Sequence, residues 1–161
     1  MTEQAFTAAA EQHLDMVYRI ALNCLRVPAD AEDAAQTVLL RLWQSDTEFA
    51  GGEHLRYWLA RVTVNVCRDM TRSPWRRRTV SLDSCREPVF QDPEHRELYE
   101  AVMALPAKYR VAIHLFYYED YSVEEIAAIL HITPGNVKTR LSRGRSALRG
   151  ALQEAWDNDE S

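Results

Sequence analysis

The chain has 161 residues, of which 47% are hydrophobic, enough for one packed soluble domain of average size or two small ones. No stretch approaches the roughly 20 apolar residues of a membrane span, and the N-terminus lacks the basic start and apolar run of a signal peptide. Three isolated cysteines and five scattered histidines form neither a disulfide framework nor a zinc ligand set. We therefore expect a cytoplasmic protein with reduced thiols, no cofactor, no metal and no membrane insertion.

Positive charge is concentrated in short segments of a chain whose formal net charge is −5. Residues 131–149 carry five Lys and Arg and no acid, and residues 76–78 are three consecutive Arg. Residues 79–130, by contrast, carry ten acids and four bases. A basic patch on an otherwise acidic protein is typical of contact with nucleic acid. Because the rest of the protein is acidic, we expect this contact to be weak when the protein acts alone.

The N-terminal half has the hydrophobic spacing of three helices. Asp30 is expected to cap the second helix, with Asp33 at the capping-box position. Gly51 and Gly52 mark a loop before the third. The predicted bounds are 3–25, 31–45 and 55–72. The apolar stripe predicted for the first helix consists of Leu14, Val17, Tyr18, Ala21, Leu22 and Leu25.

Residues 74–93 contain three prolines and no sustained period, which indicates a linker. The helical pattern then resumes, with predicted helices at 93–105, 106–120, 122–130 and 133–156. The sequence therefore predicts an all-α fold of two small helical domains joined by a flexible linker. The expected divisions are a domain at 1–73, the linker at 74–93, a second domain at 94–156 and a tail at 157–161.

The segment from Ser122 to Arg145 predicts a helix-turn-helix. Ser122 and Glu125 form a capping box for the first helix, and Thr133 caps the second, with Pro134 at its first position. Short polar and cationic residues on the second helix suit base edges and phosphates in a major groove, although a solvated basic face of an ordinary bundle has a similar composition. The expected DNA contacts are Thr133, Asn136, Val137, Lys138, Thr139, Arg140, Ser142, Arg143 and Arg145, and Val137 is also expected to hold the helix on the core.

Three motifs, in this order and spacing, resemble the extracytoplasmic-function (ECF) group of bacterial RNA polymerase sigma factors. Residues 30–44, DAEDAAQTVLLRLWQ, look like the region 2 helix of that family. Residues 57–72, YWLARVTVNVCRDMTR, are similar to its promoter-melting segment. Residues 105–145, which contain LPAKYR, SVEEIA and GNVKTRLSRGR, match its region 4. The resemblance covers nearly the whole chain.

The resemblance implies a protein without enzymatic activity that joins RNA polymerase core and directs it to promoters. Region 4 would read the −35 element as duplex, and region 2 would melt the −10 element and hold one strand. An anti-sigma factor is a further expected partner. The helix at 30–44 would contact the clamp helices of the polymerase, although a plain core stripe with a solvated face also fits it. The expected core-polymerase contacts are Asp30, Asp33, Gln36, Leu40 and Trp43.

The promoter-melting segment interleaves aromatic residues with cations, which suits an unstacked strand with a charged backbone. The loop at 48–54 would supply the pocket for a flipped base, as in the family. Trp58 could instead be a core residue, because Val62 lies one turn further on. The expected strand contacts are Phe49, His54, Arg56, Trp58, Arg61, Asn65, Arg68 and Arg72.

Departures from the family pattern include Asn136 in place of Thr, Val38 in place of Phe, and Gly144 in place of Ala. The glycine is expected to cost roughly 1 kcal/mol of helix propensity. The alternative function is a two-domain helix-turn-helix regulator that binds operator DNA as a dimer. A hydrolase is disfavoured because the sequence shows no phosphate loop, metal cluster or activated nucleophile.

Overall fold

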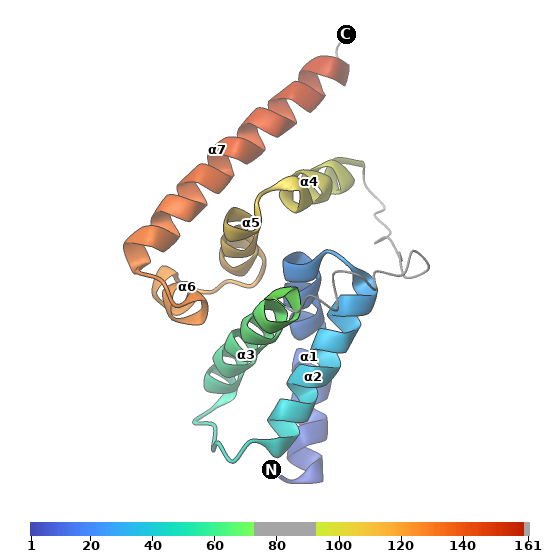
Figure 1. Cartoon of the computed structure of the whole chain (residues 1–161), viewed down its shortest axis with the longest axis vertical. Coiled ribbons are helices and arrows are strands. Elements are labelled where there is room, and N and C mark those ends of the chain that lie inside the picture. Colours follow the sequence, from blue (N-terminus) through green and yellow to red (C-terminus); the bar gives the residue numbers. More distant parts are fainter. Residues whose placement is uncertain (73–92, 160–161) are drawn as a thin grey trace. The chain divides into compact units, whose positions relative to one another are not determined.

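A computed structural model describes residues 1–72 and 93–159, and every regular element in these two ranges is a helix (Figure 1). The described helices divide into two compact units, one formed by the helices before residue 73 and one by those after residue 92. The predicted all-α, two-unit fold is confirmed. Apart from Pro93, the predicted linker lies outside the described residues, as does Cys85.

The first unit consists of three helices, and each packs against the other two. They are α1 (Glu3–Leu25), α2 (Pro28–Gln44) and α3 (Gly52–Arg72). The Thr2 hydroxyl accepts a hydrogen bond from the Ala5 N–H at 3.1 Å and so caps α1. Fully buried aliphatic side chains from all three helices form the core: Val17, Ile20, Val38, Leu42 and Leu59.

Two local predictions for this unit are wrong at least in part. The predicted stripe of α1 is confirmed at Val17 and Ala21, which are fully buried, but Leu14 is 39% exposed and the buried face also includes His13 and Ile20. Helix α2 begins at Pro28, so Asp30 lies inside the first turn and is not its N-cap, and no side chain caps this helix. Proline suits the first turn because its fixed φ is helical and its missing N–H has no partner to lose.

Two thiols of this unit lie between α1 and α3. Cys24 and Cys67 are both thiols, and neither belongs to a disulfide. A hydrogen bond with Cys24, together with burial, raises the pKa of Cys67 far above its ordinary value. The Cys67 thiol therefore stays protonated and unreactive at neutral pH.

The second unit is built around its last and longest helix. Its elements are α4 (Pro93–Ala104), α5 (Ala107–Ile113), the π-helical turn η3 (His114–Tyr118), α6 (Val123–Leu130) and α7 (Pro134–Asp159). Helix α7 packs against α4, α5 and α6. The sequence predicted one α-helix over 106–120, but its second half is π-helical. A buried hydrogen bond of 2.7 Å between His114 Nε2 and Glu119 Oε2 closes this wider turn.

Helices α5 and α7 approach each other closely at Gly144. A Cβ atom on Gly144 would lie 2.8 Å from Ile113 Cγ1 and 3.5 Å from Tyr109 Cβ. Ile113 is itself 2% exposed and belongs to the core of this unit. The glycine therefore fixes where α5 crosses α7, which in turn determines which residues of α5 lie beside the exposed faces of α7.

None of the described helices is both long enough and apolar enough to span a membrane.

Candidate nucleic-acid interface

Side-chain caps define both helices of the predicted helix-turn-helix. The Ser122 hydroxyl accepts from the Glu125 N–H at 3.1 Å, and a Glu125 carboxylate oxygen accepts from the Ser122 N–H at 2.9 Å. His131 ends α6 in the left-handed conformation, at φ 58°. The Thr133 hydroxyl then accepts from the Asn136 N–H at 3.1 Å. The capping box and the Thr133 cap are confirmed, and together they set the start and the direction of α7.

One face of α7 is held against the rest of the unit. Val137, Leu141 and Gly144 are buried and Leu148 is half-buried, at intervals of three and four residues that place them on one side of the helix. Val137 was predicted both to pack in the core and to contact DNA. Because it is fully buried, the structure supports only the packing role. Its side chain offers no surface to DNA in this arrangement.

Between residues 135 and 146, the opposite face of α7 carries small residues. Gly135, Thr139, Ser142 and Ser146 are all exposed and follow the same spacing. The Thr139 hydroxyl donates to the Gly135 carbonyl oxygen at 3.1 Å. A helix face without long side chains can approach the edges of base pairs closely.

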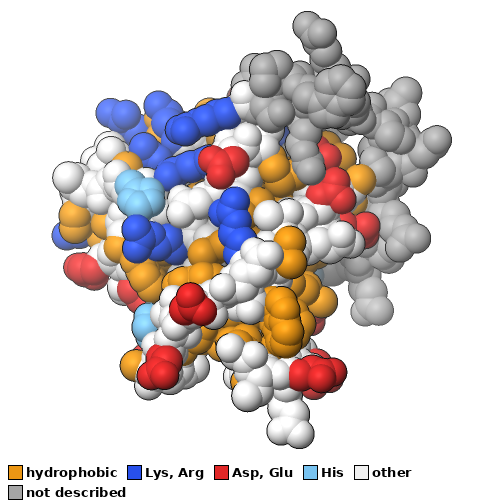
Figure 2. Space-filling view, turned by 60° about the horizontal axis from the view of Figure 1, so that its bottom comes forward, with side chains coloured by type: hydrophobic (Ala, Val, Ile, Leu, Met, Phe, Trp, Pro, Cys, Tyr) orange, Lys and Arg blue, Asp and Glu red, His pale blue; other side chains and the backbone are white. Residues whose placement is uncertain are grey.

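Long polar and cationic side chains flank these small residues on both sides. Asn136, Arg140 and Arg143 lie along one flank, and Arg140 Nε donates to Asn136 Oδ1 at 3.2 Å. The other flank carries Lys138, Arg145 and Arg149. Figure 2 shows Lys and Arg side chains gathered together on the molecular surface. Flanking cations suit the two phosphate backbones that border a DNA groove.

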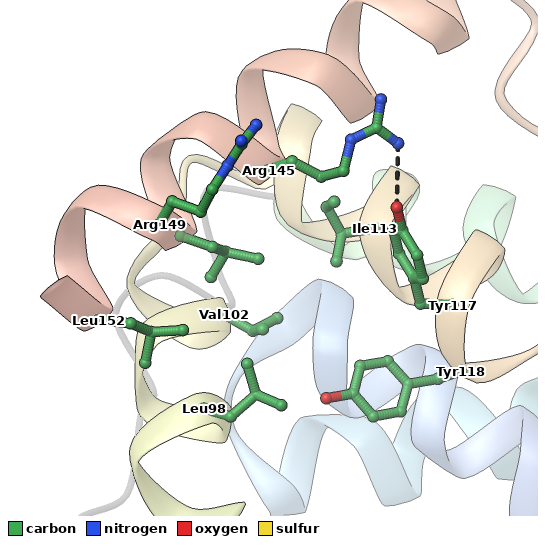
Figure 3. Close-up of a pocket in the computed structure, with 9 residues that line it drawn as sticks. Leu98, Val102, Ile113, Tyr117, Tyr118, Arg145, Arg149 and Leu152 are labelled. Carbon is green, nitrogen blue, oxygen red and sulfur yellow. Dashed lines mark hydrogen bonds between the residues drawn. The ribbon is translucent and has the colours of Figure 1, made fainter.

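An apolar groove of about 400 Å³ lies beside the second of these flanks (Figure 3). Arg145 and Arg149 border it, and Arg145 Nη1 donates to the Tyr117 hydroxyl at 3.0 Å. The sequence did not predict this contact, which joins residues 28 positions apart. The apolar lining comes from α4, α5, η3 and α7: Leu98, Val102, Ile113, Tyr118, Leu148 and Leu152.

In the first unit, six of the eight predicted strand contacts form a single stripe along α3 or at its start. They recur at alternating intervals of four and three residues, which places them on one side of the helix. None of them is fully buried, whereas Leu59, Thr63 and Val66 on the other side belong to the core. The members of this stripe are His54, Trp58, Arg61, Asn65, Arg68 and Arg72.

Phe49 joins the stripe through its ring. The ring centroid lies 5.4 Å from that of His54 and 5.4 Å from that of Trp58, both in edge-to-face geometry. The Ala50 N–H donates to His54 Nδ1 at 3.0 Å, which fixes the loop against α3 and leaves the proton of a neutral imidazole on Nε2. Phe49 also lines a cavity of about 690 Å³ between the loop at 45–52 and the start of α1.

Arg56 is separated from this stripe. Its position on α3 turns it toward the core side, near His13 of α1. Burial and, secondarily, the positive charge of Arg56 lower the pKa of His13 below its ordinary value of 6.5. The structure therefore places Arg56 in the packing between α1 and α3, apart from the other predicted strand contacts.

The predicted polymerase contacts lie mainly on the exposed face of α2. Asp33, Gln36, Leu40 and Trp43 follow one line opposite the buried residues, whereas Asp30 is half-buried beside it. Leu40 is 54% exposed and Trp43 is 46% exposed, so two large apolar side chains lie at the surface one turn apart on this helix. The Trp43 ring packs edge-on against Phe6 of α1, with 5.3 Å between centroids.

The described residues offer no alternative site with metal chemistry, because no group of three His, Cys, Asp or Glu side chains among them could hold an ion.

Comparison with known proteins assigns both units to one family. The family model "Sigma-70 region 2" matches residues 9–77, and "Sigma-70, region 4" matches residues 95–148. The ECF RNA polymerase sigma factor SigL of Mycobacterium tuberculosis is 33% identical over 156 residues, which cover 91% of this chain and 88% of SigL. The chain belongs to the ECF sigma factors.

Other similar proteins are longer than this ECF sigma factor. The chain is 35% identical to the ECF RNA polymerase sigma factor SigE of Mycolicibacterium smegmatis, over 88% of its own length and 59% of SigE. It spans 42% of the probable RNA polymerase sigma factor RfaY of Xanthomonas campestris, at 30% identity.

Among solved structures, the fold is similar to that of the sigma factor RpoE of Bartonella quintana, which was solved in complex with the anti-sigma factor NepR. The TM-score is 0.74 at 26% identity, over 93% of this chain and 98% of RpoE. The fold is also similar to CnrH, solved in complex with the cytosolic domain of CnrY, with a TM-score of 0.67 at 23% identity.

Proposed function

We propose that this ECF sigma factor is a transcription initiation factor without catalytic activity of its own. It binds RNA polymerase core in the cytoplasm and directs it to specific promoters. The observation that carries the proposal is that two helices in separate units expose different chemistry. Helix α7 presents small polar residues between rows of cations, and α3 presents aromatic residues interleaved with cations.

Helix α7 reads the −35 element as duplex. Its exposed small residues allow close approach to base edges, while Asn136 and Arg140 carry the donors and acceptors that discriminate bases in a major groove. Arg143, Arg145 and Lys138 reach the neighbouring phosphates, which fix position without reading sequence. The Thr133 cap leaves the start of α7 at the surface, where its positive dipole end favours a further phosphate.

Helix α3 and its preceding loop hold one strand of the melted −10 element. The edge-to-face cluster of Phe49, His54 and Trp58 offers aromatic surface, and the adjoining cavity can accept an extruded base. Stacking of a base on an aromatic side chain contributes about 1–3 kcal/mol, which offsets much of the free energy of opening a short A·T-rich site. Arg61, Arg68 and Arg72 follow the strand backbone along the same side of α3.

Helix α2 binds the polymerase clamp helices through its exposed line of residues. Leu40 and Trp43 supply apolar area, and Asp33 and Gln36 supply polar contacts around it. Exposed apolar residues surrounded by polar groups are typical of a protein–protein contact.

An anti-sigma factor is a further proposed partner. RpoE and CnrH, whose folds resemble this one, were solved with an anti-sigma factor and with the cytosolic domain of CnrY, respectively. The apolar groove bordered by Arg145 and Arg149 has the size and lining to take an apolar helix face with acidic residues beside it.

The decisive experiment is in-vitro transcription with purified polymerase core, this chain and a library of promoter sequences. Run-off products that require the chain establish initiation, and their start sites locate both promoter elements. Leu40→Ala combined with Trp43→Ala should reduce core binding and transcription together, without changing duplex binding by the free chain. Phe6→Leu tests whether the Trp43 contact with α1 matters separately.

Two results would contradict the proposal. One is the absence of any product that depends on the chain across the library. The other is tight operator binding by a dimer of the free chain that core does not alter, since that behaviour belongs to a helix-turn-helix regulator.

A further inference from the structure

Helix α5 brings two residues without an assigned role to the DNA-reading side of α7. Because Gly144 has no side chain, α5 crosses α7 closely, with Tyr109 Cβ 3.5 Å from where a Gly144 Cβ would lie. Tyr109 thus lies beside Arg143, on the flank of α7 that also carries Arg140. Lys108 Nζ lies 5.0 Å from the centroid of the Tyr109 ring. Two cations and a phenol hydroxyl therefore converge at the surface.

The electrostatic setting of this cluster favours negative charge. A hydrogen bond from Arg143, and secondarily the charges of Lys108 and Arg143, lower the pKa of the half-buried Tyr109 side chain. Within the described part of the chain, neither Lys108 nor Arg143 forms an ion pair with a carboxylate. Surroundings that stabilise a phenolate also attract an anion from solvent.

We propose that Lys108, Tyr109 and Arg143 form a binding site for a backbone phosphate of duplex DNA, next to the base-reading face of α7. This inference rests on the proposed function, since the phosphate belongs to the duplex that α7 reads. Arg143 would bind two phosphate oxygens through its planar guanidinium, Lys108 would act as a point charge, and the Tyr109 hydroxyl would donate a hydrogen bond.

Tyr109 has a second role in this site, as a positioning residue. An exposed arginine loses rotamer freedom when it binds a ligand. Contact of the Arg143 guanidinium with the Tyr109 hydroxyl would restrict that freedom before DNA arrives. A phosphate contact made from α5, outside the helix-turn-helix, would also fix the angle at which α7 enters the groove, because phosphate contacts set orientation and register.

The test measures binding of the full chain to a fluorescently labelled mixed-sequence duplex by anisotropy over a range of salt concentrations. Lys108→Gln should weaken binding several-fold at low salt and reduce the slope of log K against log salt by about 0.9, the value for one phosphate contact. Tyr109→Phe should weaken binding without changing the slope, because it removes no charge. Lys108→Arg should restore the parent slope.

Arg96→Gln is the matched control for loss of one charge. Arg96 is exposed on α4, where it pairs with Glu100 at 3.1 Å, away from the residues proposed to contact DNA. Circular dichroism shows whether each variant keeps the parent fold, as expected for surface substitutions. The proposal is overturned if Lys108→Gln and Arg96→Gln have the same slope.

A second measurement separates this inference from the proposed function. It uses the chain bound to polymerase core, on a promoter obtained from the transcription library. If Arg140→Ala weakens promoter binding while Lys108→Gln and Tyr109→Phe do not, the phosphate site is wrong and the sigma function stands. If the parent chain binds no duplex, alone or with core, both are wrong.

Discussion

Gly144 lies inside α7, where helix propensity alone predicts that alanine would be better by about 1 kcal/mol. The structure gives the glycine a packing reason. A Cβ atom there would lie 2.8 Å from Ile113 Cγ1, which is too close, and Ile113 is buried and cannot move aside easily. Replacing Gly144 with alanine would thus raise the helix propensity of α7 but overpack the crossing between α5 and α7.

We predict that Gly144→Ala lowers the free energy of unfolding by about 1 kcal/mol. Overpacking typically costs about 1–3 kcal/mol, which exceeds the gain in helix propensity. Gly150→Ala is the matched control in the same helix, since a Cβ there would meet nothing within 4 Å. Urea denaturation should show the control to be more stable than the parent. Equal stabilisation by both substitutions would mean that the crossing is not tight.

His13 links packing to pH. Burial, followed by the charge of Arg56, lowers its pKa from 6.5, and its Nε2 atom is buried without a hydrogen-bond partner. As the pH falls, His13 therefore takes up a proton near pH 6.5 in the unfolded chain, but only at lower pH in the folded chain. The neutral histidine contributes stability above this pH, and the contribution is lost as the pH falls through the folded pKa.

We predict that His13→Gln reduces the loss of stability between neutral and mildly acidic pH. Thermal melts of parent and variant above and below pH 6.5 give the difference, and comparing the two chains removes the effect of the other histidines. His95→Gln, an exposed position on α4, should keep the parent profile. An unchanged pH profile in the His13 variant would show that this histidine titrates normally.

At the scale of elements, α3 carries buried residues on one side and accessible residues on the other. Leu59, Thr63 and Val66 hold it against α1 and α2, while the stripe that contains Trp58 and Asn65 remains accessible. The core side fixes the rotation of the helix, so the proposed strand-binding side would be rigid before DNA binds. A rigid site loses less entropy when it captures a strand.

We predict that Asn65→Ala slows promoter opening by roughly fivefold, the effect of losing one hydrogen bond worth about 1 kcal/mol. Binding to closed duplex should not change, because the proposed function assigns that contact to α7. A fluorescent base analogue in the −10 element reports opening by the chain with core. Thr71→Ala, exposed on the same helix but off the stripe, is the control. Equal opening rates in Asn65→Ala and parent would remove Asn65 from the proposed site.

For the molecule as a whole, the distribution of charge opposes DNA binding by the free chain. The net charge is −5, and the cations of α7 are a local exception. In the proposed function each unit alone would make few contacts with a promoter, so affinity would depend on presenting both together. Polymerase core would supply that arrangement and make the second contact effectively intramolecular.

We predict that core raises the affinity of the chain for a promoter duplex by about a hundredfold or more, as expected for two linked binding modules. Anisotropy with labelled promoter DNA, with and without core, measures the change. A duplex with scrambled promoter elements controls for non-specific binding by core. Tight and specific binding by the free chain, unaltered by core, would show that the acidic body does not limit binding.

Much of this protein could be predicted from its sequence, because the relevant interactions are local. The capping box at Ser122 and the cap at Thr133 join residues three positions apart, and helical periodicity depends only on neighbouring turns. The same local patterns carry the family motifs. They were sufficient for an all-α fold, a helix-turn-helix and a sigma factor.

Only the tertiary structure decided how each helix is rotated and what lies beside its exposed faces. It turns Arg56 toward His13, exposes Leu14, and places Tyr109 and Tyr117 against the arginines of α7. Each of these outcomes depends on contacts between residues far apart in the chain. Local periodicity limits the possible rotations of a helix, but the helices packed against it select one.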